Sequence, residues 1–211
     1  FFIEIDTGDR FTLGFDLTSG PAGEQELYER TTAYMRTFYN RAGILNPSAA
    51  RLALGVFQRR LASSTYAVLR SLERRVVRLD EVVERVREGR LTPQELHAAQ
   101  LRLRDPFEDS TADEEAAVDG RESHEQDEDR LLQVIRTTSL VDLETERREV
   151  LGLIDLARGV LAAGHESKFD VLRELLLKPD YRGEKLIVFT EHRDTLEWVR
   201  QRLEGMGFTD R

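Results

Sequence analysis

Two short alternating segments open the chain. Ile3 and Ile5 fall on one face, Thr7-Gly8-Asp9 supplies a turn, and apolar residues then recur at every second position from Phe11 to Leu17. A period of two is typical of strands that bury one face. The pattern therefore predicts a strand, a turn and a second strand, similar to a β-hairpin, which Ser19-Gly20-Pro21 ends.

A helical period follows and fills the middle of the chain. Apolar residues recur every three or four positions from Leu27 to Ala42, which predicts an amphipathic helix. Asn46-Pro47 predicts the start of the next helix, and Ser63-Ser64 the start of a third that reaches Gly89. Asn and Ser favour such positions because their side chains accept hydrogen bonds from the first backbone amides.

The later helices are predicted from the capping residues at their ends. Thr92-Pro93-Gln94-Glu95 has the pattern of a capping box with proline in the first turn. The helical pattern resumes from about Asp142 and is expected to end at Gly164, and Ser167 to Leu177 predicts a short helix that Pro179 stops. Because the spacing drifts and caps interrupt it, packed antiparallel helices are favoured over a coiled coil.

The pattern changes again near the end of the chain. Lys185 to Phe189 is a short apolar run rich in strand-forming residues, typical of a parallel strand covered on both faces. The polar residues Thr190 to Arg193 follow, and then Asp194 and Glu197 are expected to cap a helix. Together they predict one α/β unit. Ligands of open α/β sheets bind beyond the carboxyl ends of the strands, which is where Thr190 to Arg193 lies.

Negative charge is concentrated in one segment. The net charge of the 211 residues is −9, whereas residues 105–129 contain 12 acidic residues and one arginine, a charge of −11. The other 186 residues therefore carry −9 − (−11) = +2. With few large apolar groups, the segment is expected to be a disordered acidic loop. An acidic metal site is the alternative, but no oxygen ligands alternate around a central glycine.

Composition argues against a membrane protein and against a metal site. The chain has no cysteine, and its apolar runs are far shorter than the ~20 residues of a membrane span. No basic leader with an apolar core opens the sequence, so a cytoplasmic protein without a membrane partner is expected. His97, His124 and His165 lie apart from one another, so no metal site is expected.

Four segments resemble a known family. The block Ser167-Lys168-Phe169-Asp170-Val171-Leu172 and the block from Gly183 to Leu196 resemble the start of the second motor lobe of helicase superfamily two. They are most similar to the Swi/Snf-related branch and its bacterial relatives, in which a Ser-x-Lys-apolar helix precedes a strand followed by a hydroxyl residue and Gln or Glu. Leu27-Tyr28-Glu29 and Leu61-Ala62-Ser63-Ser64 resemble stretches that link the two lobes.

The resemblance implies a mainly α chain with five parts. Residues 1–20 would end the first motor lobe, 21–104 would form the first half of a helical insertion, and 105–129 the acidic loop. Residues 130–180 would complete the insertion and its lead-in helix, and 181–211 would begin the second lobe, which is RecA-like. The insertion is expected to set the geometry of the lobes or to dock a protein partner.

The resemblance also implies an activity and a site. The parent protein would be an ATP-dependent helicase or translocase that uses ATP and Mg²⁺, with nucleic acid as its partner and duplex DNA as the favoured track. Thr190, His192 and Arg193 would contact the nucleic-acid backbone through hydroxyl and cationic groups. The alternative is that Thr190 and Glu191 only cap the following helix.

The nucleotide-binding motifs of that family are absent from the sequence. Gly159 and Gly164 have the glycine spacing of a phosphate-binding loop, but His165-Glu166 replaces its Lys-Ser/Thr pair. Asp113-Glu114-Glu115-Ala116 lies in the acidic segment, with no apolar strand before it. We therefore expect a piece of a longer polypeptide, with no catalytic, cofactor-binding or metal-binding residues and no ATPase activity of its own.

Other interpretations stay open at this point. A non-enzymatic helical adaptor joined to an unrelated α/β domain is the alternative to the motor. The motor would be ruled out if Leu186 to Phe189 formed a helix, or if this segment paired only antiparallel inside a self-contained fold. Lys168 is expected to face solvent rather than a phosphate, and Trp198 to cover a neighbouring element. Aromatic residues at helical spacing are expected in the core rather than stacked on bases: Tyr28, Tyr34, Phe38 and Tyr39.

Overall fold

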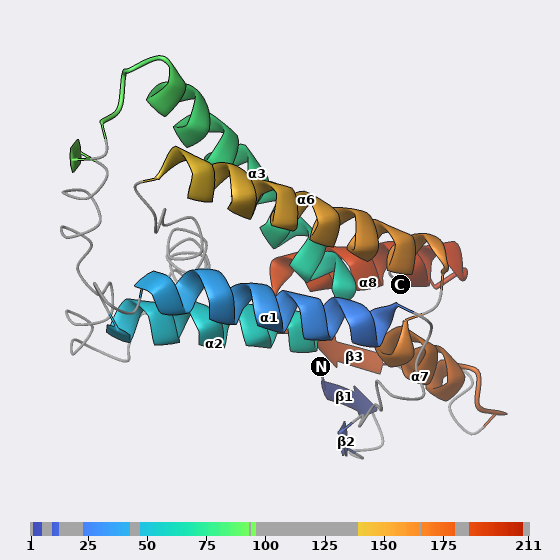
Figure 1. Cartoon of the computed structure of the whole chain (residues 1–211). Coiled ribbons are helices and arrows are strands. Elements are labelled where there is room, and N and C mark those ends of the chain that lie inside the picture. The colour runs from blue at the N-terminus through green and yellow to red at the C-terminus, as the bar shows by residue number, and fades with distance from the viewer. Residues whose placement is uncertain are drawn as a thin grey trace. The chain divides into compact units, whose positions relative to one another are not determined.

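The chain is mainly α-helical, as the sequence predicts. A computed structural model describes residues 2–5, 10–12, 23–42, 47–92, 94–95, 139–164, 166–179 and 186–208 (Figure 1). The helices are α1 (Glu24–Ala42), α2 (Pro47–Ser63), α3 (Thr65–Arg87), α6 (Leu140–Ala162), α7 (Ser167–Leu176) and α8 (Arg193–Gly205). The strands are β1 (Phe2–Ile5), β2 (Arg10–Thr12) and β3 (Leu186–Phe189).

The helix starts predicted at Pro47, Ser64 and Thr92 are confirmed. Pro47 is the first residue of α2, and Ser64 separates α2 from α3. The Ser64 Oγ accepts the Ala67 N–H at 3.0 Å and so caps α3. Thr92 and Glu95 form the capping box, in which the Glu95 N–H donates to the Thr92 Oγ1 and the Glu95 carboxylate accepts the Thr92 N–H. The Thr92 N–H and the Thr92 hydroxyl both donate to the Glu95 carboxylate, and these two hydrogen bonds lower the pKa of Glu95.

The predicted glycine ends are confirmed for α3 and α6. Gly89 and Gly164 follow these helices with φ of 69° and 74°. The left-handed region suits glycine because it lacks a Cβ, and it allows the chain to turn away after the last helical carbonyls. α7 ends at Leu176, before Pro179, also as predicted.

The described residues form two compact units. Unit 1 comprises Phe1–Glu29, Arg60–Arg70 and Asp155–Arg211, and unit 2 comprises Arg30–Arg59 and Ser71–Ile154. The helices α1, α2, α3 and α6 therefore each contribute residues to both units. Within the described ranges, no helix is both long enough and apolar enough to cross a lipid bilayer.

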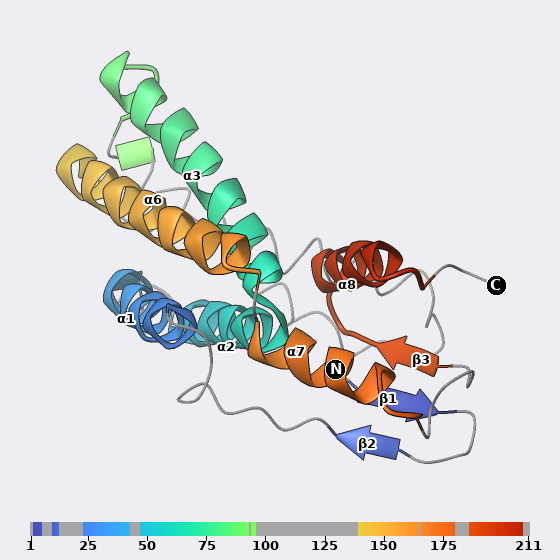
Figure 2. The same cartoon turned by 90° about the vertical axis from the view of Figure 1, so that its right-hand side faces the viewer.

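Unit 2 is a packed helical assembly in which α3 and α6 run antiparallel. Arg87 pairs with Glu144 at 2.6 Å, and Asp80 pairs with Arg147, so that rising numbers on α6 meet falling numbers on α3. Both views show these stretches of helix side by side (Figures 1 and 2). The prediction of packed antiparallel helices is confirmed for this pair. The fully buried apolar side chains of unit 2 include Leu72, Leu79, Leu143, Val150 and Leu153.

A buried ion pair lies in the core of unit 2. The Arg75 guanidinium contacts the Glu146 carboxylate at 2.5 Å, and both side chains are at most 2% exposed. The Tyr34 hydroxyl donates to the same carboxylate at 2.8 Å. Tyr34 is therefore a core residue, as expected from its helical spacing. The same expectation is wrong for Tyr28, which is 39% exposed.

Unit 1 has its own apolar core between α7 and α8. Phe169, Leu172, Leu175 and Leu176 on one helix pack with Trp198 and Val199 on the other. The rings of Phe169 and Trp198 meet edge-on with centroids 5.2 Å apart. The Arg202 guanidinium lies 4.5 Å from the centre of the Phe169 ring and donates to the Gly164 carbonyl after α6. The expectation that Trp198 covers a neighbouring element is confirmed.

The pairing of β1 with β2 agrees with the predicted hairpin, whereas β3 pairs differently from the sequence prediction. Figure 2 shows the short strands side by side in the order β2-β1-β3, and β1 pairs antiparallel with both neighbours. Phe2 lies opposite Phe189 and Thr12 in these pairings. The prediction of a parallel strand covered on both faces is therefore wrong. β3 lies at an edge, and Ile187 and Phe189 are 57% and 50% exposed.

β3 pairs with β1 because β1 is the strand that offers hydrogen-bond partners to its backbone within the described residues. Strand N–H and C=O groups need hydrogen-bond partners, and β1 supplies them within the described chain. A parallel partner needs a crossover connection of a dozen or more residues to a further strand. No such strand occurs among the described residues.

Several predictions fall outside the described residues. They concern the acidic loop at 105–129, residues 13–17 of the predicted strand from Phe11 to Leu17, and the three histidines His97, His124 and His165. The side chain of Tyr39 is also outside this set. These remain predictions from the sequence.

Candidate functional site

The segment between β3 and α8 is the predicted nucleic-acid contact. β3 ends at Phe189 and α8 begins at Arg193, so three residues join them. His192 is the N-cap, with an extended backbone, and its carbonyl accepts the Leu196 N–H at 3.0 Å. The prediction that Asp194 caps this helix is therefore wrong, because the helical backbone already begins at Arg193 and Asp194 lies in the first turn.

The three predicted contact residues differ in exposure. Arg193 is exposed, whereas His192 is only 3% exposed. Thr190 is partly buried, and its Oγ1 is buried without a hydrogen-bond partner among the described residues. The structure thus brings the three onto one short turn, and of the three only Arg193 is exposed. Their binding of nucleic acid stays a prediction.

A buried hydroxyl cluster lies behind this turn. The Thr195 Oγ1 is 2.8 Å from the Ser63 Oγ and 2.9 Å from the Ser64 Oγ, and Thr195 is fully buried. The cluster connects the first turn of α8 with the break between α2 and α3. We call residues 62–65 the α2–α3 junction.

The junction is also held by two side chains at the start of α7. The Glu166 carboxylate accepts the Thr65 N–H at 3.1 Å, and the Lys168 ammonium donates to the Ala62 carbonyl. Each acts at a helix end, where backbone groups have no partner inside the helix. Glu166 satisfies a donor of α3 and Lys168 an acceptor of α2. The expectation that Lys168 faces only solvent is therefore wrong.

Burial changes the ionisation of both side chains. Glu166 is 4% exposed, and its pKa is raised to about 7, mainly by burial. The hydrogen bond from Thr65 opposes this shift, the neighbouring carboxylate of Glu24 adds to it, and Arg202 opposes it. Burial also lowers the pKa of Lys168. The second oxygen of Glu166, Oε2, has no hydrogen-bond partner among the described residues.

Glu24 completes this arrangement from the first turn of α1. Its carboxylate accepts the Ser167 N–H at 3.2 Å and also the Ser167 hydroxyl. Ser167 is the first residue of α7, so Glu24 serves as a capping acceptor from another helix. Residues 143 positions apart in the sequence are thereby joined inside unit 1.

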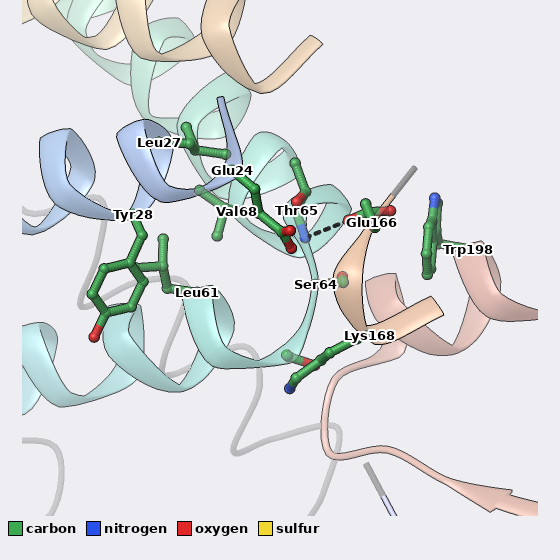
Figure 3. Close-up of a pocket in the computed structure, with 11 residues that line it drawn as sticks. Glu24, Leu27, Tyr28, Leu61, Ser64, Thr65, Val68, Glu166, Lys168 and Trp198 are labelled. Carbon is green, nitrogen blue, oxygen red and sulfur yellow. Dashed lines mark hydrogen bonds between the residues drawn. The ribbon is translucent and has the colours of Figure 1, made fainter. Parts of the chain in front are cut away.

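A small cavity lies at the centre of these contacts. Figure 3 shows Glu24 and Glu166 beside Thr65, with the dashed hydrogen bond from Thr65 to Glu166. The cavity has a volume of about 30 Å³, and its polar lining comprises Glu24, Ser63, Ser64, Thr65, Glu166 and Lys168. A volume of this size accommodates about two water molecules, whereas small-molecule sites enclose roughly 300–1,000 Å³. The cavity therefore does not fit a nucleotide.

Across the described ranges, no group of three or more His, Cys, Asp or Glu side chains is arranged to hold a metal ion.

Sequence reasoning found some of these residues and missed others. Ser63 and Ser64 were recognised as cap signals because capping is local. Thr195 and Glu166 carried no signal, since a threonine in a first turn and a glutamate before a helix are ordinary surface residues. Their partners lie 131 and 101 residues away.

Comparison of the chain with protein-family models, with curated proteins and with solved structures finds no significant match.

Proposed function

We propose that this chain is part of an ATP-dependent nucleic-acid helicase or translocase, with duplex DNA as the favoured track. In this proposal the chain supplies the end of the first motor lobe, a helical insertion and the start of a RecA-like second lobe. ATP and Mg²⁺ are bound by residues outside the chain. The insertion sets the geometry of the lobes or docks a protein partner.

One observation supports the proposal above the others. All four segments that resemble the helicase family fall within unit 1, although they are spread from Leu27 to Leu196. Three of them are joined directly, through the contacts of Lys168 with Ala62 and of Thr195 with Ser63 and Ser64. The fourth contributes Leu27 and Tyr28 to the same cavity.

The convergence matters because sequence resemblance alone does not require it. Short Leu-rich segments match many helical proteins, and unrelated matches would have no reason to lie together. Here they gather around one junction and hold it by side-chain hydrogen bonds. Unit 2, which carries the rest of the proposed insertion, contains none of the four segments.

A non-enzymatic adaptor is the second candidate function. The antiparallel pairing of β3 with β1 favours it, since the second lobe of a motor needs a parallel sheet. The exposure of Ile187 and Phe189 weighs against it, because a self-contained fold would bury such side chains. We therefore retain the motor as the main proposal.

The test compares two arginines of α8 in the complete polypeptide. Arg193 is the last residue of the proposed contact segment, Thr190 to Arg193. Arg200 is an exposed arginine seven positions further along α8. Arg193→Ala and Arg200→Ala change the net charge equally, so any difference reports position. The measurement is the affinity for a short fluorescent DNA duplex over a series of salt concentrations.

Arg193→Ala is expected to weaken duplex binding for all sequences alike. It should also lower the slope of log affinity against log salt by about 1, as the loss of one phosphate contact does. Arg200→Ala should leave both quantities close to wild type. If the two variants change duplex affinity equally, or if the protein binds no nucleic acid, the result would favour the adaptor.

A further inference from the structure

Thr195 is the residue of the hydroxyl cluster that contacts both of the others. Thr195 contacts both serines, whereas the Ser64 Oγ additionally accepts the Ala67 N–H at the start of α3. Each hydroxyl has one hydrogen to donate, so two oxygen–oxygen contacts occupy two of the three hydrogens. Loss of the Thr195 hydroxyl would therefore remove one partner from each serine at once.

Thr195 lies two residues after Arg193 on the same helix. A helix advances by about 100° per residue, so the two side chains point roughly 200° apart around α8. This agrees with their exposure, since Thr195 is fully buried and Arg193 is exposed. Fixing Thr195 against the junction therefore fixes the direction in which Arg193 leaves the helix.

Thr195 is the buried residue in the first turn of α8, whereas Arg193 and Leu196 are exposed. The N-cap residue His192 makes no side-chain capping hydrogen bond to the helix. The apolar contacts of α8 through Trp198 and Val199 lie further along, about one turn beyond the first. The Thr195 hydroxyl thus holds the turn that carries the contact segment.

We propose that Thr195 is a positioning residue, which holds the first turn of α8 against Ser63 and Ser64 so that Arg193 faces the nucleic-acid backbone. The inference rests on the proposed function. In this inference, the α2–α3 junction determines how the contact segment is oriented toward the nucleic acid.

The test uses three substitutions in the complete polypeptide and the same fluorescent duplex. Thr195→Val removes the hydroxyl at nearly constant volume, and Thr195→Ser keeps it. Ser63→Ala removes one contact of the cluster and leaves the Ser64 cap of α3 intact. Thermal melting identifies any variant that does not fold.

Thr195→Val is expected to raise the dissociation constant for the duplex about tenfold, and Thr195→Ser to restore it to within about twofold of wild type. Ser63→Ala should weaken binding in the same direction, and it tests the inference if Thr195→Val fails to fold. In the double variant Arg193→Ala/Thr195→Val, the second substitution should add little, because both act on one contact.

Three outcomes would overturn the inference. If Arg193→Ala weakens binding while folded Thr195→Val and Ser63→Ala do not, only the positioning role is refuted. If the effects of Arg193→Ala and Thr195→Val add fully, Thr195 acts on stability and not on Arg193. If Arg193→Ala itself has no effect, the proposed contact and its positioning residue are both refuted.

Discussion

The Glu166 carboxylate accepts the backbone N–H of Thr65 at 3.1 Å, although 101 residues separate them. The contact places a buried carboxyl group at the N-terminus of α3, where the helix dipole favours negative charge. Burial nevertheless dominates and raises the pKa of Glu166 to about 7. The ionised form is therefore disfavoured in the folded protein, and this has a consequence for stability.

Glu166 should make stability depend on pH between about 4.5 and 7. In this window the folded chain holds a proton that the unfolded chain, with its ordinary pKa of 4.5, has released. The free energy of unfolding should therefore fall as pH rises through the window and level off above it, by up to about 3 kcal/mol. Urea unfolding at a series of pH values measures this.

Glu166→Gln provides the comparison. The amide keeps an oxygen for the Thr65 N–H but carries no charge, so the variant should lose this part of the pH dependence and be the more stable protein above pH 7. Glu197→Gln, at an exposed position on α8, is the matched control and should follow the wild-type profile. An unchanged profile in Glu166→Gln would show that the carboxyl group titrates normally.

The buried Arg75–Glu146 pair makes a second prediction. Arg75→Met would leave a buried carboxylate without its cation, and we expect the free energy of unfolding to drop by about 3–5 kcal/mol. Replacing the three residues together, in Tyr34→Phe/Arg75→Met/Glu146→Met, should recover much of this loss, because the buried charges are removed as a pair and the hydrogen bonds to Glu146 lose both of their partners. Chemical denaturation of the variants measures both effects.

An exposed pair supplies the control for this network. Arg78 and Glu81 lie 3.0 Å apart with side chains 42% and 55% exposed. Arg78→Ala should cost less than about 1 kcal/mol. A loss in Arg75→Met as small as that in Arg78→Ala would mean that the Arg75–Glu146 contact does not form.

The sequence predicts local features of this fold better than distant ones. Ser64, the Thr92–Glu95 box and Gly164 were identified correctly because a cap involves residues within one turn. An apolar run such as Leu186 to Phe189 indicates a strand, but its composition does not encode the direction of the partner. The antiparallel pairing with β1 was for this reason not predictable.

The candidate site was predictable only in part. The turn from Thr190 to Arg193 was located from the order strand, polar loop and helix, and Arg193 is exposed there. The contacts of Thr195 were not predictable, because they depend on the α2–α3 junction more than 120 residues earlier. The burial of His192 was not predictable either, since it depends on packing in three dimensions. Arg75 and Glu146 likewise look like surface residues until α3 and α6 are packed together.

The acidic segment gives a prediction that rests on the sequence alone. Residues 105–129 lack the apolar groups needed to pack, so their deletion should leave the melting temperature nearly unchanged. Differential scanning calorimetry of the deletion variant measures this. A drop of many degrees would show that the segment packs against the rest of the protein.

The most direct test of the account is the rate of ATP hydrolysis by the complete polypeptide with and without duplex DNA. We predict that the duplex raises this rate several-fold and that the 211-residue chain alone hydrolyses no ATP. A rate that no nucleic acid changes, or no hydrolysis by the complete polypeptide, would contradict the assignment to a nucleic-acid motor.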